Sequence, residues 1–194
     1  MNPIFQFPSY LLKRQAIALT GKFRFYDPSG RLVMFSEQKM FKLREDIRVY
    51  GDESKSQEVL SIKARQILDF SAAYDVIDTE MNQKVGVLRR KGLRSLLRDE
   101  WDVLDANENV VGKLFEDSIG LALLRRFLLG SWLPQNYDIT FGETRVADLK
   151  QRFNPLRYEL DIDFTMDTAH LLDRRLGVAA GILLAAIEGK QGKE

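Results

Sequence analysis

The sequence predicts a mainly β fold, in which about twelve antiparallel strands close into a barrel around a hydrophobic C-terminal helix. Three observations carry this prediction. A two-strand unit recurs six times along the chain, the second strands alternate apolar with polar residues, and a long apolar segment follows the last unit. Repeated units that each expose one apolar face must come together to bury a common core. We therefore expect a single domain over residues 1–194.

Each unit consists of a short first strand, often basic, a second strand with aromatic or β-branched residues, and a polar turn. The second strands start at Phe23, Ile47, Tyr74, Trp101, Tyr137 and Tyr158. In the last unit, apolar residues from Tyr158 to Phe164 alternate with charged residues from Arg157 to Asp163, which is typical of half-buried strands. Residues 27–30, Asp-Pro-Ser-Gly, favour a β-turn. The strands are expected between about residues 10 and 164.

The C-terminal segment predicts one helix over about residues 168–188, with Asp167 as its N-cap and Gly189 just past its end. No polar residue interrupts it from Leu176 to Ile187, and a helix that is apolar on all sides lies in a core or a membrane. This run of 12 residues is shorter than the roughly 20 that span a bilayer, so we expect it in the barrel.

The expected barrel and helix match in size. About eight strands close into a barrel that side chains fill, so about twelve leave a lumen. A helix of 21 residues is about 31 Å long, which is enough to thread that lumen. Gly177, Gly181 and Ala185 lie four residues apart on one stripe, where small side chains let a strand wall approach closely. Helix dimerisation in a membrane is the alternative interpretation of this stripe.

Composition excludes several function classes. The net charge of +1 gives no basis for nucleic-acid binding. The chain has no cysteine, which excludes disulfides, thiol catalysis and zinc–thiolate sites and fits a reducing cytoplasm. The first ten residues lack the pattern of a signal peptide. We expect a cytoplasmic protein that contacts membranes only peripherally.

Residues 91–105 and 19–30 resemble the LURP-one-related proteins, a family that belongs with the phospholipid scramblases and the Tubby C-terminal domain. The resemblance extends over roughly Tyr10 to Ile187 and rests on the repeated unit together with the terminal apolar helix. It implies a twelve-stranded barrel around a C-terminal helix, which the repeats predict independently. For function it implies phosphoinositide binding, as in Tubby proteins, or lipid scrambling, as claimed for scramblases.

A basic cluster begins in the first strand of the fourth unit and continues beyond it. It consists of Arg89, Arg90, Lys91, Arg94 and Arg98. Clustered cations of this kind favour anionic lipid or phosphoinositide headgroups. The alternative is a solvated strand and turn, balanced by Asp99, Glu100 and Asp102. The alternation leaves open whether Arg89 and Lys91 face inward, at a barrel mouth, or outward, on a flat patch.

An inserted segment interrupts the fifth copy. Residues 118–129 predict a short helix that carries Arg125 and Arg126 among leucines, and Trp132 follows it. Such a helix can lie in a membrane interface, with its cations on lipid headgroups. The alternative, which we favour, is that it caps one end of the barrel.

Three acidic residues precede the C-terminal helix: Asp161, Asp163 and Asp167. The resemblance suggests calcium here, because scramblases carry an acidic segment at this place. An EF-hand loop starting at Asp161 would have Met166 and Leu172 where Gly and Glu are required, so we expect no metal and no cofactor. The single histidine, His170, falls in the first turn of the expected helix and is interpreted as structural.

No catalytic motif is present, so we expect a non-enzymatic module. The favoured function is peripheral binding of anionic phospholipid or phosphoinositide headgroups. A structural or protein-interaction scaffold without a lipid role is the first alternative, and a lipid-moving membrane protein is the second.

Overall fold

The computed structural model describes residues 1–15, 20–39, 46–65, 72–91, 100–117, 135–154 and 157–191. A short 3-10 turn, η1 (Pro3–Phe5), precedes twelve strands and the helix α2 (Arg174–Gln191) in this part of the chain. The strands are β1 (Ser9–Gln15), β2 (Thr20–Tyr26), β3 (Leu32–Lys39), β4 (Ile47–Tyr50), β5 (Glu58–Ala64), β6 (Ala73–Asp78), β7 (Gln83–Arg90), β8 (Glu100–Leu104), β9 (Val110–Glu116), β10 (Asn136–Phe141), β11 (Thr144–Arg152) and β12 (Arg157–Asp163).

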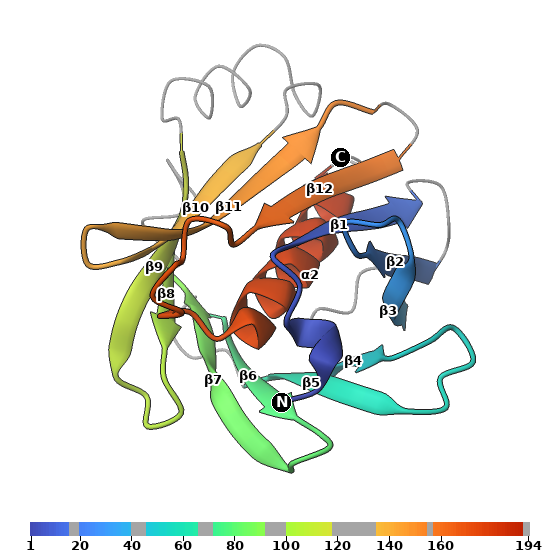
Figure 1. Ribbon diagram of the computed structural model, residues 1–194, viewed down its shortest axis with the longest axis horizontal. Coiled ribbons are helices and arrows are strands. Elements are labelled where there is room, and N and C mark those ends of the chain that lie inside the picture. Colours follow the sequence, from blue (N-terminus) through green and yellow to red (C-terminus); the bar gives the residue numbers. More distant parts are fainter. Residues whose placement is uncertain are drawn as a thin grey trace.

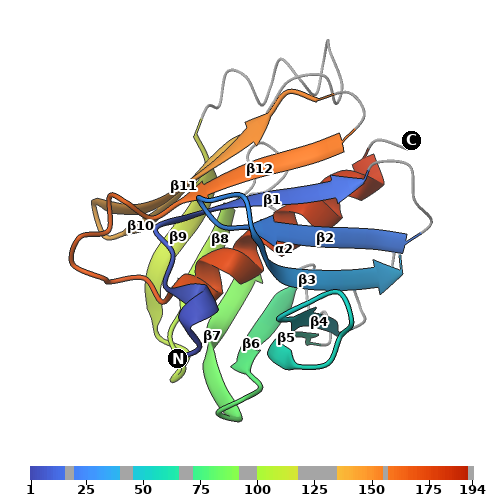
Figure 2. The ribbon, with the colours of Figure 1, turned by 45° about the vertical axis from the view of Figure 1, so that its right-hand side comes forward.

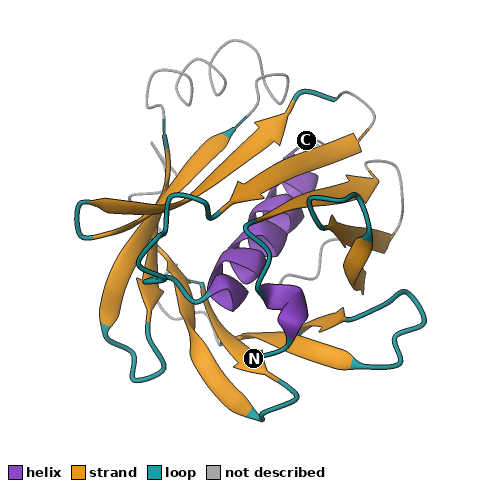
Figure 3. Cartoon of the chain, in the orientation of Figure 1, coloured by secondary structure: helices purple, strands orange, loops and turns teal. Residues whose placement is uncertain are grey.

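The twelve strands form one closed antiparallel barrel in which each strand pairs with its neighbours in sequence. Pairing of β1 with β12 closes the ring, with Tyr10 opposite Ile162 and Arg14 opposite Tyr158. Figure 1 shows the strands as a ring around α2, and Figure 3 shows the same alternation of strand and connection around the whole circumference. The predicted fold class, with its six two-strand units, is confirmed.

The helix α2 fills the lumen. Its side chains from Val178 to Ala180 are wholly buried, and so is that of Ile182. A Cβ atom at Gly177 would lie 2.4 Å from the ring of Phe164, and one at Gly181 would lie 2.5 Å from Ile162 Cδ1. Protein interiors are packed too densely to absorb such overlaps. The predicted role of the small stripe, close approach of helix and strand wall, is therefore confirmed.

The helix begins six residues later than predicted, at Arg174 instead of Thr168. Asp167 does not cap it; its carboxylate accepts hydrogen bonds from the backbone N–H groups of Leu171 and Leu172, both at 2.9 Å. These bonds close a turn in which His170 adopts a φ of +52°. The chain needs this turn because β12 ends at one end of the barrel and must reverse direction to enter the lumen.

Asp173 stands at the true start of the helix, where its carboxylate accepts a hydrogen bond from the N–H of Arg175 at 3.0 Å. At the other end α2 continues to Gln191, so Gly189 lies within the helix and does not end it as predicted. Among the described residues, no helix combines the length and the apolar character that crossing a membrane requires.

The barrel has two ends, which we call the N-terminal rim and the C-terminal rim after the end of α2 that lies there. Near the start of α2, Gly177 packs on Phe164, and one turn later Gly181 packs on Ile162, so the helix runs antiparallel to β12. Figure 2 shows this from the side. The N-terminal rim carries tight polar turns, such as the predicted turn 27–30, in which the N–H of Gly30 donates to the Asp27 carbonyl at 2.9 Å.

Candidate functional site

The outward members of the basic cluster are engaged by acidic residues of the next strand. Arg89 Nη2 lies 2.9 Å from Asp102 Oδ2. Lys91 Nζ lies 2.9 Å from Asp102 Oδ1 and 2.9 Å from Glu100 Oε1. The β7–β8 register explains this, because Arg89 is directly opposite Asp102. Arg89 and Lys91 therefore face outward, where two carboxylates offset their charge.

The titration of this group reflects the same contacts. Burial acts to raise the pKa of Asp102, but hydrogen bonds from Lys91 and Arg89 outweigh it and hold that pKa below its ordinary value. Hydrogen bonds to Asp102 and Glu100 raise the pKa of Lys91. The four residues form a balanced ionic patch, as the alternative interpretation of the cluster expects.

Arg90 points the other way. Its partner in the β7–β8 register is Trp101, which is 1% exposed and belongs to the core. Arg90 is half-buried at the end of β7. Burial raises the pKa of Tyr74 on β6, and the charge of Arg90 opposes this rise only in part. Arg90 thus lies on the inner wall of the barrel, close to the C-terminal rim.

The remaining predicted basic residues lie outside the described residues: Arg94, Arg98, Arg125 and Arg126, together with the helix expected over residues 118–129. The strand ends that flank them are described. The N–H of Lys91 donates to the Glu100 carbonyl at 2.9 Å, and the N–H of Asp117 donates to the Asn136 carbonyl at 2.9 Å. Glu100 is opposite Phe115 in the β8–β9 register. The strand ends on either side of residues 92–99 and 118–134 therefore all lie at the C-terminal rim.

The three acidic residues considered for calcium do not meet at one point. Asp161 is held by Arg152, whose Nε and Nη2 donate to it at 2.6 and 2.7 Å. Asp163 accepts a hydrogen bond from the N–H of Thr165 at 2.8 Å. Asp167 caps the turn before α2. Their oxygens are used within the protein, and no group of three metal-binding side chains occurs in the described ranges.

A groove of about 690 Å³ crosses the outer wall over β1, β11 and β12. It brings together charged residues that the sequence analysis did not connect: Lys13, Asp148, Lys150, Arg152, Asp161 and Asp163. Several of these are already paired, since Lys150 lies 2.6 Å from Asp148 and Arg152 lies 2.6 Å from Asp161. The groove mixes both signs of charge, so it does not present the single-sign field that attracts an anionic surface.

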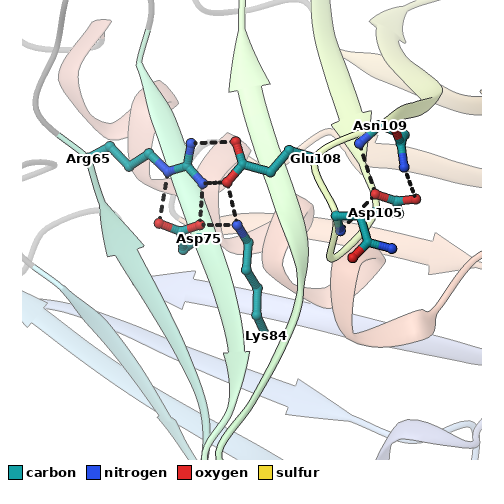
Figure 4. A network of polar contacts seen from close by, with 7 residues as sticks. Arg65, Asp75, Lys84, Asp105, Glu108 and Asn109 are labelled. Atoms are coloured by element: carbon teal, nitrogen blue, oxygen red, sulfur yellow. Dashed lines mark hydrogen bonds and ion pairs between the residues drawn. The ribbon is translucent and has the colours of Figure 1, made fainter.

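A second ionic network, which the sequence analysis missed, links β6 and β7 to the residue after β5 and to the β8–β9 turn on the outer wall (Figure 4). Arg65 lies 2.6 Å from Asp75 and 2.7 Å from Glu108, and Lys84 bridges the same two carboxylates at 3.2 and 2.6 Å. Glu108 belongs to the β8–β9 turn and has a φ of +68°. The consecutive pairing of strands β5 to β9 brings the four residues together.

A pocket of about 550 Å³ opens at the N-terminal rim, between the N-terminal segment and the turn before α2. Its lining includes Phe5, His170, Leu171 and Arg174. The sequence analysis missed it because residues 168–173 were expected to be helical. The combination of a basic residue with apolar neighbours just before an apolar helix was the available signal.

The architecture defines a class of protein: a closed twelve-stranded antiparallel barrel threaded by its own C-terminal helix. The family model of the LURP-one-related proteins matches residues 33–184, and the chain belongs to that family. The crystal structure of an Arabidopsis thaliana protein is similar, with a TM-score of 0.52 and 14% identity over 99% of this chain and 97% of that one. At this identity the likeness shows the shared fold. A search of curated proteins finds no match.

Proposed function

We propose that the protein is a non-catalytic module that binds anionic phospholipid or phosphoinositide headgroups peripherally, with its C-terminal rim against the membrane. The observation that carries the proposal is the antiparallel topology of the barrel. It places the strand ends on either side of both basic segments, 92–99 and 118–134, at the same rim. The LURP-one-related family and its barrel fit a lipid-binding type of module.

The predicted basic residues differ in how available their charges are to a membrane surface. Arg89 and Lys91 are offset by Asp102 and Glu100, so they add little net attraction to an anionic surface. Arg90 lies on the inner wall. We therefore assign the headgroup contact to the four arginines of the two connecting segments. These are Arg94, Arg98, Arg125 and Arg126.

The test is co-sedimentation of the purified protein with phosphatidylcholine vesicles that contain phosphatidylserine or a phosphoinositide. Attraction to such a surface is worth on the order of 1 kcal/mol per Lys or Arg, which corresponds to about five-fold in affinity. We expect one double reversal, Arg94→Glu with Arg98→Glu, to weaken binding by at least an order of magnitude. Raising salt from low to physiological strength should also weaken it.

The second double reversal, Arg125→Glu with Arg126→Glu, locates the contact. If it alone abolishes binding, the inserted segment is the main contact. A matched control at the opposite rim is Arg31→Glu with Lys55→Glu, which changes charge equally at exposed positions and should leave binding unchanged.

Three outcomes overturn the proposal. If the wild-type protein does not bind anionic vesicles, the result favours the scaffold alternative. Equal losses with the control reversal mean that only net charge matters. Movement of a labelled lipid between leaflets in reconstituted vesicles would favour the lipid-moving alternative.

A further inference from the structure

The pocket at the N-terminal rim combines apolar walls with a cation. Its apolar lining comes from Met1, Phe5, Leu171 and Leu172, and its polar lining includes Arg174, the first residue of α2. Figures 1 and 2 both show the N-terminal turn beside the start of α2. At about 550 Å³ the pocket lies within the range of roughly 300–1,000 Å³ that is typical of small-molecule sites.

Arg174 contacts neutral groups among the described residues. Its Nη1 donates to the carbonyls of Gln6 and Phe7 at 2.5 and 2.6 Å, and its guanidinium lies 5.7 Å from the centre of the Phe164 ring. No carboxylate in the described ranges forms an ion pair with it. Its positive charge is therefore not taken up by a direct ion pair in this part of the chain, and the N-terminal end of the helix dipole adds positive potential there.

The carboxylate that lines the pocket is already committed. Asp173 accepts from Arg175 Nε at 2.9 Å and from Nη2 at 2.5 Å. Arg175 in turn reaches the buried Asp78 at 2.5 Å. Arg175 thus engages both of these carboxylates, and Arg174 remains available to a ligand in this pocket.

The backbone conformation of the turn before α2 leaves part of the pocket's apolar wall exposed to solvent. Asp167 fixes the N–H groups of Leu171 and Leu172, and the positive φ of His170 redirects the chain just before them. As a result Leu172 is 3% exposed and packs in the core, whereas Leu171 remains 48% exposed. An exposed leucine and an exposed methionine, at 51% for Met1, together form an apolar surface next to Arg174.

We infer that this pocket binds a single-chain amphiphile with a carboxylate head, such as a medium-chain fatty acid. The carboxylate accepts hydrogen bonds from the Arg174 guanidinium, for which charge-assisted pairing is strong. The alkyl chain lies over Leu171 and Met1 and removes their exposed apolar surface from water. This site is at the opposite end of the barrel from the proposed membrane contact and does not depend on it.

The test is isothermal titration calorimetry of the full chain with dodecanoate, kept below the concentration at which it forms micelles. We expect saturable binding of one dodecanoate per chain. Arg174→Gln should weaken it about ten-fold or more, because it removes the charge-assisted bonds. Dodecanol, which has the same chain but no charge, should bind weakly and equally to the wild type and to Arg174→Gln.

A second variant tests the site independently, in case Arg174→Gln fails to fold. Leu171→Asp places a carboxylate on the exposed apolar wall and should abolish dodecanoate binding while leaving the thermal unfolding midpoint unchanged. Its matched control is Val110→Asp at the start of β9, since Val110 is exposed to a similar degree, 53%, outside the pocket. This control should bind dodecanoate as the wild type does.

The inference fails if the wild type shows no saturable binding, if dodecanol binds as tightly as dodecanoate, or if Val110→Asp loses as much affinity as Leu171→Asp. Vesicle binding by Leu171→Asp separates this site from the proposed function. It should equal that of the wild type, and a loss there would place the membrane contact at this rim instead.

Discussion

Gly177 shows how the packing of the helix against the barrel wall constrains a single residue. Intrinsic propensity favours Ala over Gly in a helix by about 1 kcal/mol. In this position a Cβ atom would lie 2.4 Å from the ring of Phe164. That ring is itself held between Tyr10, at 6.1 Å between ring centres, and Arg174. For a change of Gly177 to alanine, packing and helix propensity therefore act in opposite directions. The larger of the two decides whether the stability of the protein falls or rises.

We predict that Gly177→Ala destabilises the protein, because overpacking a dense core costs typically about 1–3 kcal/mol and exceeds the gain in helix propensity. Urea unfolding followed by circular dichroism measures the change. Gly51→Ala is the control, since a Cβ atom there meets nothing within 4 Å and should change stability little. A more stable Gly177→Ala variant would show that Phe164 can move aside.

The pair of Arg175 and Asp78 is the second residue-scale feature. The Asp78 side chain is 1% exposed and lies 2.5 Å from Arg175, whose side chain is 10% exposed. Asp78→Ala should destabilise the protein by about 3 kcal/mol, because it leaves the guanidinium without its buried partner. Thermal and urea unfolding test this. Asp161→Ala removes an exposed pair with Arg152 and should cost at most about 1 kcal/mol.

At the scale of elements, the network of Arg65, Asp75, Lys84 and Glu108 clamps the β8–β9 turn over β6 and β7. Hydrogen bonds from Arg65 and Lys84 lower the pKa of Glu108 to about 2, and hydrogen bonding to Arg65 likewise lowers the pKa of Asp75. A carboxylate whose pKa is lower in the folded state stabilises that state above its unfolded pKa. This stabilisation is lost as the pH falls through the folded value.

We therefore predict that Glu108→Gln is less stable than the wild type at pH 7, and that the difference shrinks between pH 4.5 and about 2, where Glu108 becomes protonated. Denaturant unfolding at both ends of this window measures it. Because these groups lie at the surface, high salt should reduce the difference at pH 7 as well. A difference independent of both pH and salt would instead point to the backbone of the turn, where Glu108 has a positive φ.

At the scale of the whole molecule, the barrel and helix form one folding unit. The inner walls of β1, β6, β7 and β12 contact α2, and the closed ring leaves no strand edge in the described chain. We predict that removal of residues 168–194 yields a product without cooperative unfolding, because the lumen loses the apolar surface that fills it. Calorimetry and binding of a hydrophobic dye measure this. A truncated chain that unfolds cooperatively would contradict the role of α2 as the core.

Local sequence patterns are sufficient to predict most of the architecture. The six units, their alternation and the apolar helix predict the number of strands, the direction of their inner faces and the occupant of the lumen, because each depends on neighbours a few residues apart. The stripe of Gly177 and Gly181 could be interpreted from spacing alone for the same reason. The extent of the basic cluster was visible in the sequence, but the direction of its charges was not.

Tertiary structure decided what depends on partners distant in sequence. Asp102 neutralises Arg89 only because β7 and β8 pair in that register, and Arg65 meets Glu108 only because strands β5 to β9 lie side by side in the sheet. The start of α2 moved to Arg174 because the chain must turn over the rim before it enters the lumen, a constraint absent from helix propensity. The pocket beside Arg174 follows from that turn, since register, closure and chain reversal are properties of the assembled barrel.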